Sequence, residues 1–337
     1  MEMDQSQEQR TPTLVHQVPA AASPMDISML GANTGISGVT SWLYRQPSAK
    51  DERIDASVLD NNAAVASSMQ WNNRDTNDTN TLRYYIDKCK AHIRDIYTPH
   101  RVTTLAQKMN IIPGLALDLT TTYENGVAWD FNIKERRIAA ERLIRENKAS
   151  LLIVNPMCTV FSTAYRPNQS KIASEERARH IAYGRIHLDF AMYLCRMQHR
   201  MGLYYLFEHP RYAVSWKEYS VEQTLQYTEG IITDAYMCQF NMRQIYETGE
   251  ALIMKPTKCM TNSEKVARVL SKRCPGDNRH IPLQGGDITR KAQLYPDKLC
   301  NIIMDSLCEQ LDHDWRIDKE SKMGTIQEEC NSTGDSK

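Results

Sequence analysis

The sequence predicts an α/β fold in which helices flank a mostly parallel, Rossmann-like sheet. Short apolar runs of strand length alternate along the chain with longer segments whose apolar residues recur at helical spacing. Three of these runs lead into a polar residue, at Asp118, Asn155 and Glu208. Because strand–helix–strand units bring the carboxyl ends of parallel strands to one edge of the sheet, we expect these residues to face one crevice.

The predicted elements follow one another without an internal repeat. Helices are expected over residues 82–96, 133–147, 175–201 and 296–311, from apolar residues spaced three and four apart. Strands are expected over residues 114–119, 150–154, 203–207 and 231–237. Asn155-Pro156 stops the second strand, and Gly202 ends the third helix, as a glycine after a helix commonly does.

Polar segments flank the alternating region, which we place at residues 81–311. Residues 1–80 predict a disordered polar leader, and residues 312–337 predict a disordered acidic tail. The 337-residue chain is formally neutral, yet residues 81–310 carry a charge of +8 and the two flanks together carry −8. A neutral chain excludes a strongly basic DNA-coating protein, whereas the basic central part keeps nucleic acid as an expected partner.

Composition also bears on location. No apolar run reaches the roughly 18 residues that a membrane span needs, and the first residues lack the pattern of a signal peptide. The nine cysteines are odd in number and form no Cys-x-x-Cys pair, which is typical of reduced thiols inside a cell. We therefore expect an intracellular protein that is not secreted and has no membrane partner, with the nucleus as a plausible compartment.

Two residues at strand ends have chemistry of interest. The thiol of Cys158 is a candidate nucleophile, because a strand end that starts a turn or helix can lower the pKa of a cysteine. Glu208 is a candidate to hold or deliver a proton. The alternatives are that Cys158 is a small buried hydrophobic residue and that Glu208 is an ordinary surface carboxylate. We interpret His209 as a polar residue that precedes Pro210.

A metal site is not predicted. Cys259, Cys274 and His280 have side chains that bind zinc, but they are separated by 15 and 6 positions. Structural zinc sites more commonly contain Cys-x-x-Cys pairs, which are missing here.

The segment around Cys158 resembles a known family. Leu151 to Ser162 reads LLIVNPMCTVFS, and it is similar to the catalytic motif of DNA cytosine-5 methyltransferases, where a strand runs into Pro-Pro-Cys. The run 204–210, YYLFEHP, resembles the glutamate strand of that family. Its glutamate, Glu208, lies 50 positions after Cys158, a separation that suits the family. Residues 255–257, KPT, are similar to a segment found in phage-type and mobile-element-type members of the family. Residues 116–119, ALDL, resemble the first strand of the family, which leads to the S-adenosylmethionine loop.

This resemblance implies a reaction and a cofactor. Cys158 would add to C6 of a cytosine flipped out of DNA, Glu208 would contact the ring, and S-adenosylmethionine would supply the methyl group. The cofactor-binding candidates are Asp118, Gly126, Trp129, Asp130, Asn155 and Pro156. The substrate-binding candidates are Ser162, Arg243, Lys255 and Thr257.

A second interpretation has equal weight. The family has a glycine-rich loop after its first strand, and this chain has Thr-Thr-Thr-Tyr-Glu-Asn-Gly from residue 120 to Gly126. Glycines let the backbone approach a ligand closely, which threonines do not. On this interpretation we expect a catalytically degenerate module of mobile-element origin that binds nucleic acid without methyl transfer. A thiol hydrolase built on Cys158 and a distant histidine has no supporting spacing.

Overall fold

The computed structural model describes residues 89, 91–109, 111–122, 126–165, 172–246, 249–277, 279–283 and 286–332. All of them belong to one compact unit. The predicted leader over residues 1–80 lies outside these residues.

A five-stranded sheet forms the centre of the described structure, with the strand order β1-β2-β3-β7-β4. Its strands are β1 (Ala91–Ile96), β2 (Ala149–Val154), β3 (Tyr204–Pro210), β7 (Pro256–Thr261) and β4 (Ile231–Tyr236). β1, β2 and β3 are parallel, and β7 is antiparallel to both β3 and β4. β4 therefore runs in the direction of β3, so the sheet is mostly parallel. The predicted α/β class is confirmed, and the arrangement is compatible with a Rossmann-like fold.

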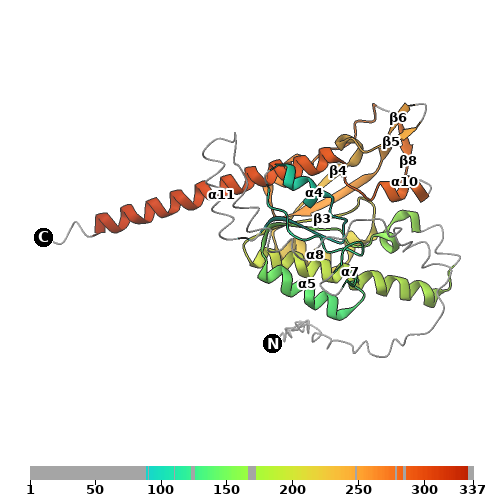
Figure 1. The fold of residues 1–337 in the computed structure, drawn as a ribbon, viewed down its shortest axis with the longest axis horizontal. Coiled ribbons are helices and arrows are strands. Elements are labelled where there is room, and N and C mark those ends of the chain that lie inside the picture. Colours follow the sequence, from blue (N-terminus) through green and yellow to red (C-terminus); the bar gives the residue numbers. More distant parts are fainter. Residues whose placement is uncertain are drawn as a thin grey trace, which may run out of the picture. The chain divides into compact units, whose positions relative to one another are not determined.

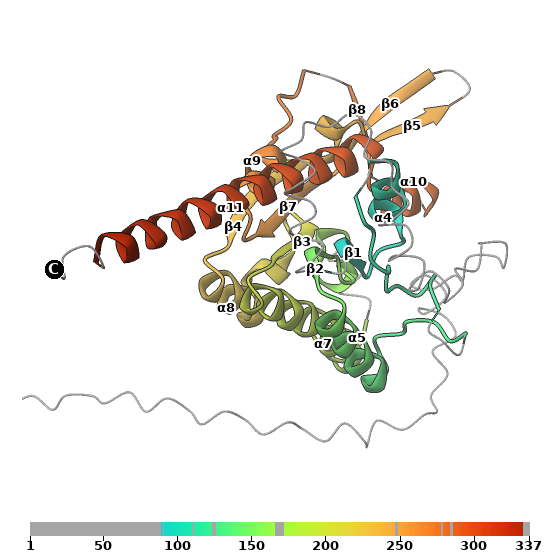
Figure 2. The same cartoon turned by 60° about the vertical axis from the view of Figure 1, so that its left-hand side comes forward.

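Helices cover both faces of this sheet (Figure 2). One face carries α5 (Lys134–Glu146), α7 (Ser174–Arg200) and α8 (Tyr219–Tyr227), and the other carries α4 (Arg101–Ala106), α9 (Glu264–Leu270) and α11 (Asp297–Ser332). The side chains of β2 alternate between two hydrophobic cores. Leu151 and Ile153 pack with α4, α9 and α11, while Leu152 and Val154 pack with α5 and α7. Burial on both faces explains why β2 is an unbroken apolar run.

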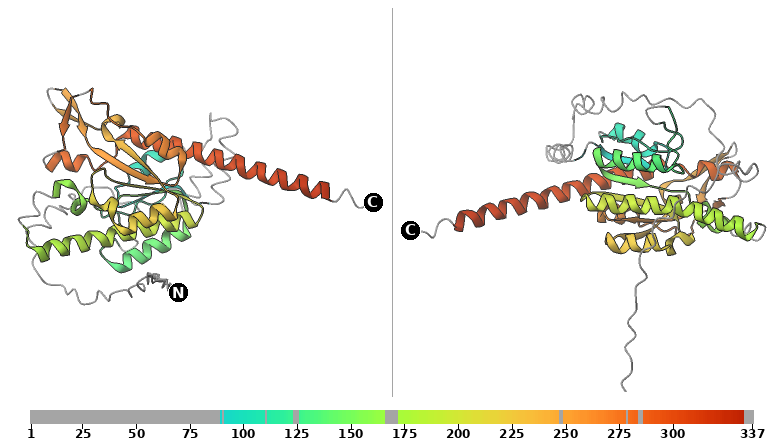
Figure 3. Two further views of the ribbon diagram at one scale, coloured as in Figure 1. Left: turned by 180° about the vertical axis from the view of Figure 1, so that it is seen from behind. Right: turned by 90° about the horizontal axis from the view of Figure 1, so that it is seen from below.

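A second, three-stranded sheet follows the order β5-β6-β8. It consists of β5 (Arg243–Tyr246), β6 (Gly249–Met254) and β8 (His280–Pro282), and α10 (Gly286–Lys291) follows it in the chain. In the view from behind, these orange strands lie away from the green helix α5 (Figure 3). Short 3-10 helices complete the described elements: η2 (Gln107–Met109), η3 (Thr159–Phe161), η4 (Thr163–Tyr165), η5 (Val214–Lys217) and η6 (Met237–Phe240).

Most predicted elements are confirmed to within a few residues, namely the helices over 133–147 and 175–201, the strands over 150–154, 203–207 and 231–237, and the start of the last helix. The predicted helix over 82–96 is wrong where the structure describes it, because residues 91–96 form β1. All six residues of β1 are buried, including Arg94 and Asp95. Because two of these buried residues are charged, β1 lacks the apolar run by which a buried strand is recognised in a sequence.

The predicted strand over residues 114–119 is replaced by an irregular extended segment beside β1. Its contacts with β1 are two parallel bridges, Ile93 to Pro113 and Ile96 to Leu117. The Gly114 and Leu117 N–H groups donate hydrogen bonds to carbonyl oxygens of β1. β1 is therefore the first strand of the described sheet. Asp118 directly follows the irregular segment beside β1, which is the second extended segment of the described chain.

The C-terminal segment also differs from the prediction. Residues from 312 onward were expected to be disordered, yet α11 continues to Ser332 and extends past the sheet (Figure 1). Its side chains support the helix through an ion pair four residues apart, between Asp312 and Arg316, which helices favour. Within the described residues, none of the helices has both the length and the apolar character that a membrane crossing requires.

Helix α7 packs tightly against η3, the short helix that follows Cys158. A Cβ atom built on Gly184 of α7 would lie 2.3 Å from Cγ2 of Val160 and 3.2 Å from the Phe161 ring. Real side chains do not approach so closely, so only glycine permits this contact.

We therefore expect Gly184→Ala to destabilise the fold by about 1–3 kcal/mol, because overpacking forces α7 away from η3. The sign is informative, since glycine to alanine inside an unconstrained helix stabilises by roughly 0.5–1 kcal/mol. Urea unfolding followed by circular dichroism measures the change, with Asp189→Ala at an exposed position of α7 as the control. A Gly184→Ala protein that is as stable as the wild type would contradict the packing described.

Candidate functional site

The topology places a ligand crevice at the carboxyl ends of β1 and β2. From β1 the chain passes through α4, on one face of the sheet, to the segment beside β1 that ends at Leu117. It then returns to the other side of β1 to form β2, which is followed by α7 on the opposite face. Open α/β sheets bind ligands at such a switch point, outside the carboxyl ends of the two strands.

Cys158 lies in the loop that leaves β2 at this crevice. The Asn155 N–H donates a hydrogen bond to the Ile96 carbonyl oxygen at 3.1 Å, which extends the pairing of β1 and β2 by one residue. Pro156 then prevents further strand pairing, and Cys158 caps η3. Cys158 is half-buried and belongs to neither of the two hydrophobic cores.

Glu208 lies on the neighbouring strand β3, and it is buried with 8% of its surface exposed. Its Oε1 is 3.6 Å from Nζ of Lys255, which is itself largely buried between β6 and β7. The Lys255 ammonium also donates a hydrogen bond of 3.0 Å to the Ala292 carbonyl oxygen. Two predicted residues, Glu208 and Lys255, therefore form a buried ion pair beside the predicted nucleophile.

The electrostatics of this group act on the Cys158 thiol. The pKa of Cys158 is raised to about 11: burial is the largest cause, the negative charge of Glu208 adds to it, and the positive charge of Lys255 opposes both. The expectation of a lowered pKa at this strand end is wrong for this structure. The thiol is protonated at neutral pH and needs a change in its surroundings to become a nucleophile.

His209 joins the Glu208 strand to the Cys158 loop. Its Nε2 lies 3.1 Å from the Pro156 carbonyl oxygen, and its Nδ1 lies 2.8 Å from the Ser215 hydroxyl. Burial lowers the pKa of His209 to about 4. A neutral ring donates from Nε2 to the carbonyl oxygen and accepts the Ser215 O–H at Nδ1. His209 is therefore a buried polar residue before Pro210, and its ring also holds Pro156 relative to β3.

Two buried acceptor atoms in this region have no hydrogen-bond donor among the described residues: Oδ1 of Asn155 and Oε1 of Glu208. The Asn155 Nδ2 donates to the Tyr295 hydroxyl at 2.9 Å, which fixes the orientation of the amide. Buried polar atoms normally find partners, and an exception is an indication of a missing ligand or water. Tyr295 is 140 positions from Asn155 in the sequence, so this contact depends on the tertiary fold.

The carboxyl end of β1 contributes two further residues that the sequence did not reveal. Asp95 is fully buried, and its Oδ2 accepts hydrogen bonds from the Thr103 N–H and hydroxyl at 3.2 and 3.1 Å. Burial raises the pKa of Asp95 to about 7, and the charge of Asp118 adds to this effect. Tyr97 follows β1 with a φ of 64°, a left-handed conformation that is unusual for a bulky residue and occurs at functional turns.

The remaining cofactor candidates are not gathered at this crevice as one group. Asp118 is half-buried, and its Oδ1 accepts hydrogen bonds from Thr120. Trp129 is 2% exposed and belongs to the core beneath α5, beside Phe131. Asp130 closes a turn by accepting from Asn132, and Gly126 is exposed with a φ of 74° and no heavy atom near its Cβ position.

The remaining substrate candidates are divided between three places. Thr257 is fully buried between β3 and β4, where its hydroxyl donates to the Lys255 carbonyl oxygen at 3.3 Å. Ser162 follows η3 and donates to the Thr159 carbonyl oxygen. Arg243 lies on β5 in the second sheet and forms an ion pair with Glu250, so it is not part of the Cys158 group.

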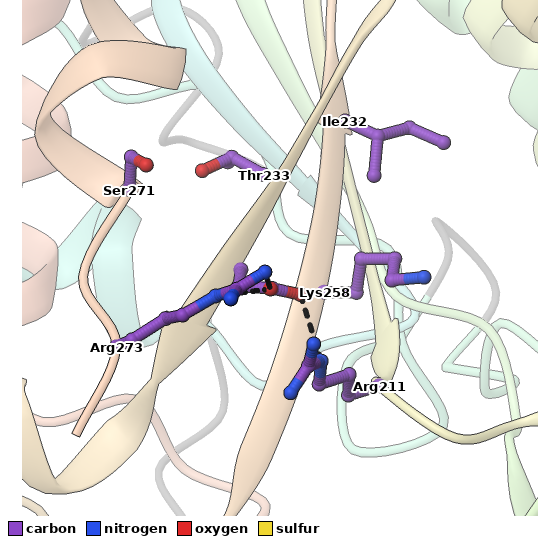
Figure 4. A pocket seen from close by; sticks show the side chains of 7 residues that line it. Arg211, Ile232, Thr233, Lys258, Ser271 and Arg273 are labelled. Carbon is purple, nitrogen blue, oxygen red and sulfur yellow. Dashed lines mark hydrogen bonds and ion pairs between the residues drawn. The ribbon is translucent and has the colours of Figure 1, made fainter. Parts of the chain in front are cut away.

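A basic cavity of about 600 Å³ lies along the edge strand β4, and neither Cys158 nor Glu208 lines it. Three cations, Arg211, Lys258 and Arg273, line it together with one carboxylate, that of Asp234. Asp234 pairs with Arg211 at 3.0 Å and with Arg273 at 2.6 Å (Figure 4). Arg211 directly follows β3, so the strand that carries Glu208 leads to this cavity.

The zinc-type residues are arranged differently from the group considered in the sequence. Cys259 is buried on β7 opposite Glu208 and takes no part in a cluster. Cys274 and His280 do lie together, and their third neighbour is Cys238.

A comparison of this chain with known protein-family models and with curated proteins finds no match. The assignment of function therefore rests on the geometry.

The reactivity of Cys158 tests the electrostatics of the site. A pKa of about 11 leaves on the order of one thiol in a thousand ionised at pH 8, so alkylation by iodoacetamide is expected to be slow. Glu208→Gln removes the opposing charge and raises the rate by roughly 3- to 10-fold, whereas Lys255→Met lowers it. Mass spectrometry of the Cys158 peptide gives the rates. Equal rates in all three proteins would show that these charges do not act on the thiol.

Asp95 makes stability depend on pH. The folded protein holds the Asp95 proton up to about pH 7, while the unfolded chain releases it near pH 4. At Asp95 the folded state therefore binds more protons between these values, and the contribution of Asp95 to stability falls as the pH rises from 4 to 8, by about 1–4 kcal/mol. The lowered pKa of His209 acts in the opposite direction below about pH 6.5, so the Asp95 contribution is read from the difference between the wild type and Asp95→Asn. Asp95→Asn removes this dependence in urea unfolding at a series of pH values, and Asp189→Asn on the exposed face of α7 keeps it. Wild-type and Asp95→Asn profiles with the same slope over this range would refute the assignment.

Proposed function

We propose that this chain is a cytosine-5-methyltransferase-like protein, in which the crevice at the ends of β1, β2 and β3 receives a cytosine flipped out of nucleic acid. One observation carries the proposal. Cys158 and Glu208, on the ends of adjacent parallel strands, are near enough for the carboxylate charge to affect the pKa of the thiol. The resemblance of both segments to the family's cysteine and glutamate motifs adds to it.

The chemistry needs a thiolate, a proton donor and a methyl donor. Sγ of Cys158 forms a bond to C6 of the cytosine, the electrons of the C5–C6 bond become available at C5, and Glu208 holds a proton at N3. S-adenosylmethionine, when bound, supplies the methyl group to C5. Loss of the C5 proton to a base then restores the double bond and expels Cys158 as a thiolate.

The two buried acceptor atoms, Oε1 of Glu208 and Oδ1 of Asn155, complement the hydrogen-bond donors of a cytosine. Cytosine presents an amino group at C4 and, when protonated, an N–H at N3. Both are donors. The buried Oδ1 of Asn155 has no hydrogen-bond donor among the described residues, and the buried Oε1 of Glu208 lies 3.6 Å from the Lys255 ammonium, which is beyond hydrogen-bond distance.

The ion pair makes the nucleophile depend on substrate. Glu208 disfavours the thiolate as long as its charge is uncompensated, and Lys255 favours the thiolate. A bound cytosine that shares a proton with Glu208 reduces the repulsion between the carboxylate and the Cys158 thiolate. The effect of Lys255 then dominates, and the pKa of Cys158 falls. The thiolate is formed when the substrate is present, which limits side reactions of the thiol.

One residue near the switch point, Asp118, fits the sugar of S-adenosylmethionine. Asp118 follows the second extended segment, 22 positions after Ile96 at the end of β1. This is the place of the acidic residue that binds ribose in dinucleotide-binding folds. Asp118 would hold the ribose hydroxyls through its Oδ2, since Oδ1 accepts from Thr120.

A suicide substrate tests the proposal. An oligonucleotide with 5-fluorocytosine cannot lose its C5 substituent, so with S-adenosylmethionine present it is expected to form a complex with the wild-type protein that survives denaturing electrophoresis. Cys158→Ala is expected to form none, and Cys308→Ser, a half-buried cysteine on α11, is the matched control that retains it. No complex with any DNA or RNA form of the oligonucleotide, or a complex that persists in Cys158→Ala, would contradict methyl transfer.

The second candidate function is nucleic-acid binding without transfer. The observation that favours it is the basic cavity with three cations to one carboxylate, together with Lys258 above the Trp216 ring at 5.4 Å. Cations next to aromatic rings are common in surfaces that bind single-stranded nucleic acid. This function is supported if Arg273→Ala and Lys258→Ala weaken salt-dependent binding while no covalent complex forms.

A further inference from the structure

We propose that Cys238, Cys274 and His280 bind a zinc ion, with water as the fourth ligand. In the part of the chain that the structure describes, these three form the one cluster of potential metal ligands, and their ligand atoms all lie within 4.8 Å of one another. Their position next to the second sheet is separate from the Cys158 crevice, so the inference does not rest on the proposed function.

Two parts of the chain that are distant in sequence supply the ligands. Cys238 belongs to η6, directly after β4, and is 4% exposed. Cys274 belongs to the connection between α9 and β8, and His280 is the first residue of β8. Among the described residues 271–277 and 279–280, Cys274 and His280 are half-buried and all others are exposed. The chain therefore turns inward at the two residues that can bind a metal.

The distances fit a tetrahedral zinc ion. Sγ of Cys274 and Nε2 of His280 are 3.5 Å apart. Zinc bonds of about 2.3 Å to sulfur and about 2.0–2.1 Å to nitrogen, at tetrahedral angles, place two such ligands about 3.5 Å apart. Two thiolates and one imidazole are a soft ligand set, which selects zinc over magnesium or calcium.

The backbone around Cys274 also fits a thiolate. Gly276 has a φ of 83°, and this turn directs its N–H to Sγ of Cys274 at 3.4 Å. A backbone donor to sulfur stabilises the negative charge that a metal-bound cysteine carries. Both thiols release their protons to solvent when the metal binds.

The bound ion acts as a structural clip. The segment over residues 271–280 has few buried side chains of its own, and the ion fixes it to η6. η6 in turn contacts the Cys158 region, because the Met237 N–H donates to the Lys255 carbonyl oxygen at 3.1 Å. The clip thereby supports the backbone that positions the Lys255 ammonium.

The test uses the full chain purified under reducing conditions after expression in zinc-supplemented medium. Elemental analysis is expected to find about one zinc per chain, and at least a roughly tenfold lower content in Cys274→Ser and in His280→Ala. Cys308→Ser is the matched control and keeps the metal. A wild-type protein without zinc, or zinc that survives both substitutions, overturns the proposal. So does a Cys238–Cys274 disulfide found by peptide mapping of the reduced preparation.

A second measurement avoids variants that fail to fold. Cobalt added to the chelator-stripped wild-type protein is expected to give a thiolate-to-metal charge-transfer band and the intense visible bands of tetrahedral coordination. Removal of zinc is expected to lower the melting temperature by several degrees, and its return to restore it. A weak octahedral cobalt spectrum, or a melting temperature that ignores the metal, counts against the site.

Discussion

A buried ion pair beside a thiol is the constraint on which the rest of the site depends. Glu208 and Lys255 are both largely buried, and a buried pair is retained only where additional hydrogen bonds compensate the loss of water. The Lys255 ammonium donates one to the Ala292 carbonyl oxygen, whereas Oε1 of Glu208 accepts no hydrogen bond from a described residue. The carboxylate is thus the incomplete partner, and a ligand that donates a hydrogen bond to it would be held tightly while relieving the repulsion of Cys158.

The frame around this pair is built from three strands and their connections. β2 and β3 bring the Cys158 loop and Glu208 together, and the His209 ring joins Pro156 to β3. Lys255 stands at the junction of β6 and β7, where the two sheets are continuous in the chain. The second sheet therefore affects the chemistry at Cys158. The zinc ion proposed at Cys238, Cys274 and His280 would hold η6 against β8, and this would also fix the Lys255 ammonium that favours the thiolate.

The sequence predicts the parts of this site that follow from simple periodicity. β2 is recognisable because burial on both faces makes it an unbroken apolar run, which Asn155 follows. β3 is recognisable from its apolar residues 204–207, although Glu208 and His209 lie within the strand and not after it. β1 is missed because Arg94 and Asp95 are buried within it, and no local pattern distinguishes a buried charge from an exposed one. Tyr295 and the Cys238 cluster are missed because they depend on tertiary packing between segments far apart in sequence.

Binding of the methyl donor divides the two functions most directly. In the proposed methyl transfer, S-adenosylmethionine binds at the switch point, with its ribose next to Asp118. Titration calorimetry of the full chain with S-adenosylmethionine is expected to show one site with micromolar affinity, weakened at least about tenfold, or 1.4 kcal/mol, by Asp118→Ala and unaffected by Asp189→Ala. No heat of binding at millimolar ligand, or equal affinity in Asp118→Ala, would contradict the cofactor site on which methyl transfer depends.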